Sequence, residues 1–447
     1  MKKRYINDII EGGDREEFVQ GWLVSRRKGK NYFFLDITDS TGRIQVVIDK
    51  NTLSEDQLAV VKSIPLESAV SLKGECQLSE SGVPEILASS IEVEGVASLR
   101  LSPRPNSPRF DPFDPKHTEQ LTKHPTFYIR NPKLAAALKF KSRFRHNLAQ
   151  WFWDHGYTQF EPPTFTTQTL YDDSGVFWLD LNGQKVSLSR CATFHLEPAL
   201  MAYEKVFAIT DSHANEMSRS DRHLAEYTHL KAELAWVNLD DLIAIAGEMF
   251  YDVARRTVDD CSREIETLNL VRKIDTRVRK LNPNNHTTIT YDEAVELLNG
   301  EGEVMEYGRS LSSRNEKRLT EVVDHNFLWI KHIPCSAEGF PFKRKPDAPH
   351  LTMACDLIAP GGYAEILGTA EKIVDYQELL ERMGEKGKDT PEQLARYKDY
   401  LDLRRYGLPE HGGIGMGIER AVRYILDLSH VRFTRPFPSI HGTKINF

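Results

Sequence analysis

One stretch of the sequence, Val206–Glu233, constrains the fold of the chain more than any other. It begins with a short apolar run, continues through a loop rich in charge, and returns to alternating apolar residues over Leu224–Leu230. This pattern predicts two strands joined by a polar loop. The charged loop residues are Glu216, Arg219, Asp221, Arg222 and His223. Because so much charge is costly to bury without a partner, the loop is either a solvated hairpin connection or one wall of a site for a charged ligand.

The composition limits the class of protein. The chain has 447 residues, which suggests two or three domains, and its 40% hydrophobic and 28% charged residues are ordinary for a globular protein with a core. No apolar run approaches the roughly 20 residues that span a bilayer, and the N-terminus lacks the apolar segment of a secretory signal. The five cysteines form no CxxC pair, which argues against a zinc site or a disulfide framework and favours a reducing, cytoplasmic environment.

Residues 1–97 are expected to form a small β-barrel domain. A helix-like segment, Glu55–Ile64, lies between the third and fourth of five strand-like runs. The runs are Phe18–Val24, Tyr32–Ile37, Ile44–Ile48, Val70–Leu78 and Glu85–Val93. Five short strands with one helix in this position predict an OB-fold.

A basic loop in this domain lies next to aromatic residues. Because the net charge of the chain is −7, a nucleic-acid partner would require a local patch of this kind. Basic side chains attract phosphates and aromatic rings stack on bases, as single-stranded nucleic acids require. The alternative is a solvated loop beside two core aromatics. The residues concerned are Arg26, Arg27, Lys28, Lys30, Tyr32, Phe33 and Phe34.

Residues 98–130 are rich in proline and lack periodicity, which predicts a semi-extended linker. A helix is expected from Asn131 and Pro132, as N-cap and first-turn residues, to about Asp154. The strand-like segment Tyr157–Thr169 follows and is broken by a Pro-Pro pair. A long helix followed by a proline-stopped strand suits a dimer interface.

The rest of residues 131–447 mixes strands with unevenly spaced helices, which predicts an α+β antiparallel sheet rather than a doubly wound one. Thr290 and Glu293 form the capping box of one helix. Strand-like runs lie at 176–181, 186–189, 206–209, 326–336, 351–358 and 363–367, and the longer helical segments at 239–268 and 375–400.

The segment GGIGMGIER, residues 412–420, reads as a strand that enters a helix. Gly413, Gly415 and Gly417 alternate, so they share one face and leave room for a flat ring against the backbone. Arg420, at the start of the helix, could stack on that ring or reach a phosphate. Tight packing between strand and helix is the alternative explanation for the glycines.

Asp356 and Glu365 lie on two strands joined by the turn Pro360-Gly361-Gly362. A hairpin can bring the two carboxylates together, and such a pair needs a cation or a shared proton. The two hypotheses are a magnesium site for a nucleotide and a pair of solvated hairpin charges.

These pieces, in this order, resemble a class II aminoacyl-tRNA synthetase, most closely the archaeal and eukaryotic cytoplasmic asparaginyl-tRNA synthetases. The resemblance covers nearly the whole chain. It implies an antiparallel-sheet catalytic domain preceded by an anticodon-binding OB-fold, and a homodimer joined through residues 134–165. The motifs that carry it are RHLAEYTHLKAE (222–233), DLIAPGGYAEILG (356–368), LRRYGLPEHGG (403–413), GIGMGIER (413–420) and FLDITDSTGRIQVVI (34–48).

The resemblance also implies a mechanism. Such enzymes bind ATP and Mg²⁺, join the carboxylate of an amino acid to the α-phosphate, and pass the aminoacyl group to tRNA, mainly through positioning and charge neutralisation. Arg222, His223 and Arg420 would be the catalytic residues. The nucleotide would be bound by Glu216, Arg222, His223, Gly415, Gly417 and Arg420, the metal by Asp356 and Glu365, and tRNA by Arg26, Phe34 and Gln45.

The sequence departs from the family at the amino-acid end. Ala214 replaces the arginine that holds the α-phosphate and the substrate carboxylate together, and Lys372 replaces the arginine that recognises the substrate side chain. Losing the first should cost on the order of 10²–10³ in rate. His213 and His195 are further candidates for the altered pocket, unless they are packing or surface residues. The substrate-binding candidates are Ala214, Lys372, Thr193, His195, Glu226 and Arg405, and the loop before them reads Asp172, Asp173, Ser174, Gly175.

The leading hypothesis is therefore an asparaginyl-tRNA synthetase-like ligase that activates asparagine, aspartate or an analogue, with tRNA as a possible acceptor. One alternative is a biosynthetic paralogue that amidates or conjugates the activated carboxylate. Another is a non-catalytic protein that binds a nucleotide or tRNA and regulates another process.

Overall fold

The structure is a computed structural model that describes residues 2–12, 16–170, 173–218 and 220–443. The chain divides into two compact units, Met1–Phe110 and Asp111–Phe447. Each unit has its own hydrophobic core.

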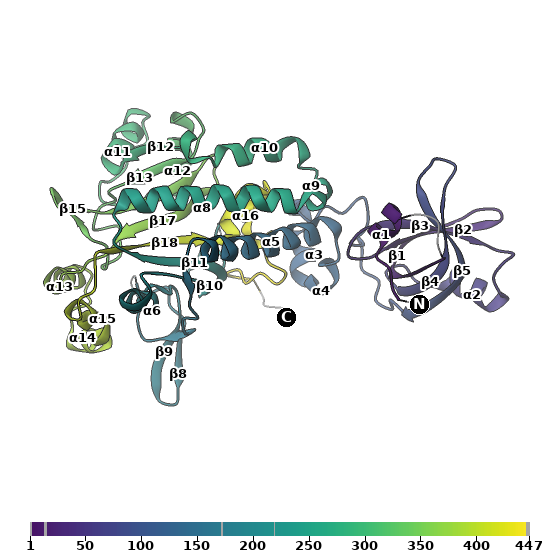
Figure 1. Ribbon diagram of the computed structural model, residues 1–447, viewed down its shortest axis with the longest axis horizontal. Coiled ribbons are helices and arrows are strands. Elements are labelled where there is room, and N and C mark those ends of the chain that lie inside the picture. The colour runs from purple at the N-terminus through teal and green to yellow at the C-terminus, as the bar shows by residue number, and fades with distance from the viewer. Residues whose placement is uncertain (1, 13–15, 171–172, 219, 444–447) are drawn as a thin grey trace. The chain divides into compact units, whose positions relative to one another are not determined.

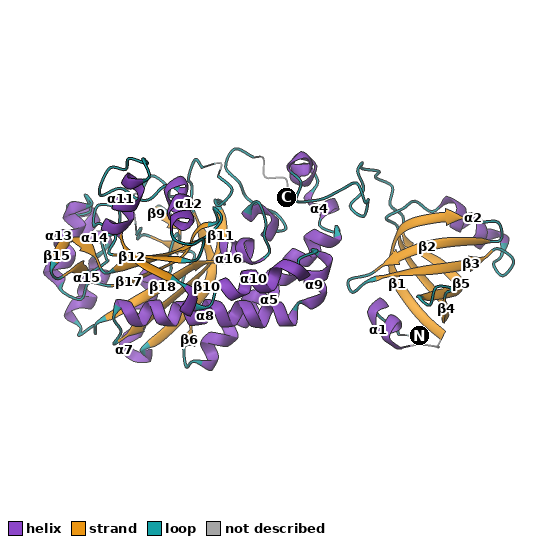
Figure 2. Ribbon diagram, turned by 90° about the horizontal axis from the view of Figure 1, so that it is seen from above, coloured by secondary structure: helices purple, strands orange, loops and turns teal. Residues whose placement is uncertain are grey.

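The N-terminal unit is a closed five-stranded barrel with the strand order β1-β2-β3-β5-β4 (Figure 2). Buried and solvent-facing residues alternate along β2 and most of β3, and this places Leu35, Ile37, Ile44 and Val46 in the barrel core. The OB-fold prediction is confirmed. The elements are α1 (Ile6–Gly12), β1 (Glu16–Lys28), β2 (Tyr32–Thr38), β3 (Arg43–Asp49), α2 (Glu55–Ser63), β4 (Ala69–Leu78) and β5 (Pro84–Gly95).

Part of the segment expected to be an extended linker is helical. It contains η1 (Pro115–His117), α3 (Thr118–Lys123) and α4 (Pro125–Tyr128). Prolines occupy the first turn of η1 and of α4, where the missing N–H has no intrahelical partner and the fixed φ suits a helix start. The prolines therefore begin helices here instead of keeping the chain extended.

An eight-stranded sheet forms the centre of the second unit, in the order β12-β13-β16-β17-β18-β11-β10-β6. Its inner neighbours pair antiparallel, and only the β12–β13 and β10–β6 pairs at its two ends are parallel. The predicted α+β class is confirmed. The strands are β6 (Thr158–Gln159), β10 (Lys205–His213), β11 (Glu226–Ala235), β12 (Thr287–Thr290), β13 (Leu328–Lys331), β16 (Ala354–Ala359), β17 (Ala364–Glu371) and β18 (His411–Gly417).

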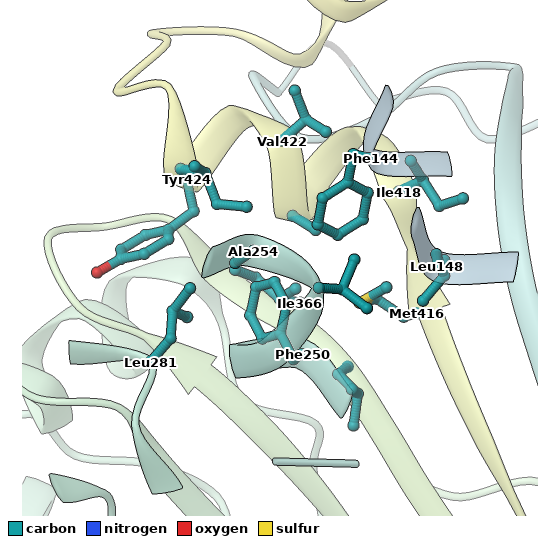
Figure 3. Packing of buried hydrophobic residues seen from close by; sticks show 14 of the residues in the cluster. Phe144, Leu148, Phe250, Ala254, Leu281, Ile366, Met416, Ile418, Val422 and Tyr424 are labelled. Carbon is teal, nitrogen blue, oxygen red and sulfur yellow. The ribbon is translucent and has the colours of Figure 1, made fainter. Parts of the chain in front are cut away.

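Three helices cover one face of this sheet: α5 (Pro132–Asp154), α8 (Leu239–Asp260) and α16 (Ile418–Ile425) (Figure 1). Their apolar faces meet the inward residues of β10, β11, β17 and β18 in one core. Figure 3 shows Phe144 of α5, Phe250 of α8 and Val422 of α16 in this cluster. The opposite face of β11, β17 and β18 is free of these helices and carries the cavity described below.

Helix starts follow the sequence signals. Asn131 caps α5 by accepting hydrogen bonds from the backbone of Lys133 and Leu134, and Pro132 is the first helical residue. Thr290 and Glu293 form the predicted capping box of α11 (Tyr291–Gly300). Each such cap satisfies backbone donors that the helix leaves free and typically contributes about 1 kcal/mol.

Several predicted elements differ in extent. The helix expected over 375–400 is divided into α13 (Tyr376–Glu385), α14 (Pro391–Arg396) and α15 (Lys398–Asp402). The strand expected over 157–169 is reduced to β6 and β7 (Phe165–Thr166), because the Pro-Pro pair between them cannot donate ladder hydrogen bonds. The helix expected over 239–268 is interrupted at Cys261, where α9 (Ser262–Thr267) begins. The strand expected over 326–336 is limited to β13.

The remaining elements surround the sheet. They are β8 (Trp178–Leu181), β9 (Gln184–Leu188), α6 (Thr193–Leu196), η2 (Glu197–Ala199), α7 (Leu200–Tyr203), α10 (Val271–Lys280), η3 (Pro283–Asn285), α12 (Ser313–Val322), β14 (Arg344–Lys345), β15 (Ala348–Thr352), α13 (Tyr376–Glu385), α14 (Pro391–Arg396), α15 (Lys398–Asp402), η4 (Leu403–Arg405) and η5 (Val431–Thr434). Among the described residues, no helix combines the length and apolar character needed to cross a bilayer.

Replacing Phe144 tests the core between α5 and α16. Phe144 is fully buried, so Phe144→Ala should lower the free energy of unfolding by about 3–5 kcal/mol, since it removes apolar contacts and leaves a cavity. Urea unfolding followed by tryptophan fluorescence measures this, because five of the six tryptophans lie in the second unit. His146→Ala, at an exposed position of the same helix, is the control and should change stability by less than about 0.5 kcal/mol. Equal effects would contradict the packing.

Candidate active site

A cavity of about 600 Å³ lies on the face of the sheet that α5, α8 and α16 leave free. Its floor comes from β11, β16, β17 and β18. Because side chains alternate along β11, Leu230, Ala232 and Leu234 point into the core, and the residues between them point into the cavity. The cavity-facing row of β11, a name kept below, is Tyr227, His229, Lys231 and Glu233.

Glycines on β18 lie opposite this row. Gly413 pairs with Glu233, Gly415 with Lys231 and Gly417 with His229. A Cβ on Gly413 would meet the Glu233 carboxylate at 2.6 Å, and a Cβ on Gly415 would collide with the Nζ of Lys231. The space above Gly413 and Gly415 therefore holds side-chain ends from β11, and a flat ring there would have to share or displace them. A Cβ on Gly417 would meet only Arg420, at 3.6 Å.

The charged loop of the opening stretch forms one wall. Arg190 Nη2 donates to Glu216 Oε1 at 2.6 Å, and Arg222 Nη1 donates to Glu316 Oε2 at 2.8 Å. His223 lies beside them, with its Nε2 3.9 Å from Glu216 Oε2. Burial and then the neighbouring arginines lower the pKa of His223, so this side chain is neutral near pH 7. The loop is thus a wall of paired charges rather than a solvated connection, although Arg219 lies outside the described residues.

Arg420 joins this wall to the floor. It lies in the first turn of α16, and its Nη1 contacts the backbone oxygen of Glu365 at 3.0 Å and the Glu365 Oε2 at 3.2 Å. The guanidinium is thereby held at the junction of β17, β18 and α16. It stays charged, so it can neutralise an anionic ligand without being recruited from solvent.

Four carboxyl groups gather at this end of the cavity. Asp356 Oδ1 and Glu365 Oε1 both approach Gly368, at 2.9 Å and 4.0 Å from a Cβ placed there. Burial, and then Glu365, raises the pKa of Asp356 well above its usual value. Burial raises the pKa of Glu316 and of Glu338 to about 7, with further repulsion from Glu365 in both cases. The prediction that the hairpin brings Asp356 and Glu365 together is confirmed by their positions.

This donor set fits a hard cation. Carboxylate oxygens suit Mg²⁺, which usually takes one or two of them and completes its shell with phosphate oxygens and water. The described residues contain no group of three or more histidine, cysteine, aspartate or glutamate side chains that could hold a metal ion by themselves. A metal here would therefore depend on ligand oxygens for the rest of its coordination.

The other end of the cavity is deeper and more strongly buried. Lys372 Nζ lies 3.9 Å from Glu233 Oε1, and these side chains are 4% and 1% exposed. Behind them, Glu197 accepts hydrogen bonds from Tyr400 at 2.8 Å and from Arg404 at 2.9 Å. Burial alone would raise the pKa of Glu197, but Arg404 and His411 more than offset this and lower it to about 2. A buried ion pair with its hydrogen bonds satisfied fixes the shape of this end.

Most of the site residues predicted from sequence meet in this cavity. They are Thr193, Ala214, Glu216, Arg222, His223, Asp356, Glu365, Lys372, Gly415, Gly417 and Arg420. Ser174, Gly175 and Cys191 also line it, whereas Asp172 lies outside the described residues. Asp173 points elsewhere and binds Thr169 and Arg396.

Three predicted substrate-binding residues do not line the cavity. Glu226 is held by Arg435 Nη2 at 2.8 Å, at the end of β11. Arg405 is exposed and stacks over Tyr376, because its neighbour Arg404 takes the buried position. His195 follows Thr193 on α6, and burial lowers its pKa. His213, the further candidate, contacts the backbone oxygen of Ser189. The structure therefore places these residues outside the pocket.

The residues expected to bind nucleic acid have different environments in the barrel. Arg26 Nη1 donates to the backbone oxygens of Val61 and Ile64 at the end of α2, at 2.8 Å and 2.9 Å. Its guanidinium therefore closes a helix end and is not offered to a ligand. Arg27, on the other face of β1, lies over the ring of Phe34 and donates to Gln45 at 2.6 Å.

Several cavity residues were not predicted. Arg190, Glu316 and Glu338 come from three separate segments, and no sequence pattern connects them. Lys231 could have been found, because the alternation in EYTHLKAE puts it on the same face as Tyr227, His229 and Glu233.

Comparison with known proteins shows the family. Residues 117–441 match class II tRNA synthetases (D, K and N), and residues 18–94 match the OB-fold nucleic acid binding domain. The chain belongs to the class II tRNA synthetase (D, K and N) family, and it is an aminoacyl-tRNA synthetase-like ligase.

Individual relatives agree over the full length. The chain is 33% identical over 443 residues to an asparagine–tRNA ligase of Pyrococcus furiosus, with 98% of each chain covered, and 32% identical over 441 residues to that of Pyrococcus abyssi, with the same coverage. The crystal structure of asparaginyl-tRNA synthetase from Pyrococcus horikoshii complexed with asparaginyl-adenylate superimposes with a TM-score of 0.90, at 31% identity and 99% coverage of both chains. The expected family is confirmed, and the alternatives of a conjugating paralogue or a non-catalytic regulator are not favoured.

The adjacent arginines Arg404 and Arg405 give a matched test of the deep end. Arg404→Met would leave the charge of Glu197 buried without its main partner, so we expect a loss of about 3–5 kcal/mol in the free energy of unfolding. Arg405→Met removes an exposed charge and should change stability by less than about 0.5 kcal/mol. Urea denaturation of both variants measures the difference. Similar small losses in both variants would contradict the buried ion pair.

Proposed function

We propose that this chain activates asparagine or aspartate with ATP, releases pyrophosphate, and passes the aminoacyl group to tRNA. The observation that carries the proposal is that one cavity joins a wall of arginines and carboxylates to a buried end lined by Lys372 and Glu233. The amino-acid carboxylate would attack the α-phosphorus where the two ends meet. Catalysis would then depend on positioning and on fixed charges rather than on a covalent enzyme intermediate.

The nucleotide would occupy the end with the arginines. Arg222 and Arg420 would face the phosphates, with His223 beside them, and Glu216 would accept from the adenine amino group. Gly417 would allow the ring to approach the backbone of β18, whereas at Gly415 the ring would have to displace the Nζ of Lys231. These guanidinium groups are already held by Glu316 and Glu365, so little reorganisation is needed when ATP binds.

Mg²⁺ would be held by Asp356 and Glu365 together with phosphate oxygens. The ion would supply positive charge that offsets the repulsion among the carboxylates and the phosphates. Arg222 and Arg420 would still be needed, because the two carboxylates offset part of the charge of the ion. The arginines would neutralise the phosphate charge that remains.

The amino acid would occupy the deep end. Lys372 and Glu233 provide one cation and one carboxylate there, and Thr193 adds a hydroxyl. Ala214 forms the wall where the family has an arginine, and its side chain cannot contact a phosphate. We infer that this position limits the rate of activation.

A homodimer through residues 134–165 is part of the proposal. Strand β6 is the last strand of the sheet order. Trp153 at the end of α5 is 51% exposed, and Phe165 in β7 is 48% exposed. Large exposed apolar side chains next to a sheet edge favour burial against a second copy. The mass of the chain in solution tests this. Cys191, Cys261, Cys335 and Cys355 are buried free thiols in the structure, which supports the reducing, cytoplasmic environment expected from the sequence.

ATP–pyrophosphate exchange with each of the twenty amino acids tests the function directly. Exchange with asparagine or aspartate, followed by charging of tRNA, is the expected result. ATP binding without exchange for any amino acid would overturn the proposal.

Restoring the arginine tests the role of position 214. Ala214→Arg should raise the rate of pyrophosphate exchange on the order of 10²-fold, because a guanidinium would hold the α-phosphate and the attacking carboxylate together. Ala214→Met adds similar length without charge and should give no increase. Unchanged or lower activity in Ala214→Arg would show that the pocket has been rebuilt around the small residue.

The tRNA contact is tested by another adjacent pair. Arg27→Gln should weaken tRNA binding and reduce the slope of log affinity against log salt by about 1, as expected for one lost phosphate contact. Arg26→Gln should instead lower the stability of the barrel unit and leave the salt slope unchanged. Filter binding across a salt series and thermal unfolding separate the two effects. A changed salt slope for Arg26→Gln alone would reverse the assignment.

A further inference from the structure

Lys231 occupies the middle of the cavity-facing row of β11. It pairs with Gly415 across the strands, and its Nζ lies where a Cβ on that glycine would be, with its Cε 3.1 Å away. The ammonium group therefore lies along the cavity floor and not in bulk solvent. The side chain is half-buried.

This ammonium forms no ion pair with the residues that the structure describes. Among the described residues, no carboxylate oxygen lies within 4.0 Å of Lys231 Nζ. Glu233, two residues along the same face, is paired with Lys372, and Glu197 is paired with Arg404. A cation that is partly removed from water without a partner is costly. The deep end of the cavity therefore carries an unbalanced positive charge.

The surroundings indicate which part of a ligand would meet this charge. Arg222 and Arg420 already serve the nucleotide end, and they are the cations that oppose the raised pKa of Glu316. Lys231 lies two residues from Glu233 on the same face of β11, and Glu233 contacts Lys372 at the deep end. Burial lowers the pKa of His229, the preceding residue of the row, and both Lys231 and Arg420 lower it further. The anion that would bind Lys231 therefore belongs to the amino acid rather than to the terminal phosphates.

Glu233 supplies the complementary group. Burial raises the pKa of its carboxyl, and Lys372 and Lys231 are among the groups that oppose this shift. Its Oε2 is buried and has no hydrogen-bond donor among the described residues. The deep end thus offers one carboxylate acceptor between two ammonium donors, Lys231 and Lys372. An amino acid with one ammonium group and two carboxylates has the matching pattern.

We propose that Lys231 binds a second carboxylate on the substrate, so that this site takes an aspartate-sized acidic amino acid in preference to its amide. The inference rests on the proposed function and names its substrate class. One carboxylate attacks the α-phosphorus, the new C–O–P linkage forms, and pyrophosphate leaves with the electron pair of the broken P–O bond. The other carboxylate stays with Lys231, and the substrate ammonium donates to Glu233.

Pyrophosphate exchange with L-aspartate and with L-asparagine, on the full chain, tests the proposal. The wild type should prefer aspartate. Lys231→Gln should lower kcat/KM for aspartate by about 10- to 100-fold, as expected when a charge-assisted hydrogen bond is lost, and change that for asparagine by less than about threefold. Lys205→Gln, on the neighbouring strand and exposed, is the control and should change neither. Thermal unfolding confirms that each variant is folded.

Other outcomes would overturn the inference. Preference of the wild type for asparagine would exclude the acidic substrate. Equal losses for both amino acids, with a raised KM for ATP, would place Lys231 at the phosphates. If no amino acid supports exchange, the proposed function fails, and calorimetry with α,β-methylene ATP then tests Lys231 alone. Tighter binding of aspartate than asparagine, lost in Lys231→Gln, would uphold the inference, and equal binding would overturn it.

Discussion

The central strands of the large sheet carry apolar side chains on the face that packs against the helices. On the opposite face their side chains line a charged cavity. In β11, Leu230, Ala232 and Leu234 pack under the helices, and the residues between them reach the cavity. A shift of one residue against β10 or β18 would put lysine and glutamate into the core and leucine into the cavity. The free energy of that exchange holds the register, and the register in turn places every charged group of the site. Stability and function therefore depend on the same hydrogen-bond ladder.

Most of the charged side chains of the site form ion pairs with one another. Arg222 is fixed by Glu316, Arg420 by Glu365 and Glu197 by Arg404. Each pair gains little net stability, because removing two charges from water offsets their attraction. What the pairs provide is position: the guanidinium groups already face the space where anionic ligands would bind. Lys231 differs from these residues, because its charge has no such protein partner among the described residues.

Local sequence patterns predicted the elements and the residues that share one strand or one turn. The caps at Asn131 and Thr290, the glycine strand and the Asp356–Glu365 hairpin all follow from neighbours in the chain. The ends of the elements were harder to predict. In the segment after Gly156 the expected long strand is reduced to two short ones, because the Pro-Pro pair cannot donate ladder hydrogen bonds. Choices between adjacent side chains failed for a different reason. Arg26 and Arg27, or Arg404 and Arg405, have the same chemistry, and only packing decides which one is buried. Glu316 and Glu338 reach the site through tertiary contacts that no spacing encodes.

The glycine strand also has a consequence for how this site can vary. Above Gly413 and Gly415 the volume of the cavity is bounded by the ends of Glu233 and Lys231 and not by main chain. The reach of the deep end is therefore set by two side chains on a strand whose other face is already fixed by the core. Exchanging those two residues would change the length and the charge of the accepted ligand while leaving the backbone in place. The choice of ligand at this end can therefore change through side-chain substitutions alone, without a change in the backbone of the sheet.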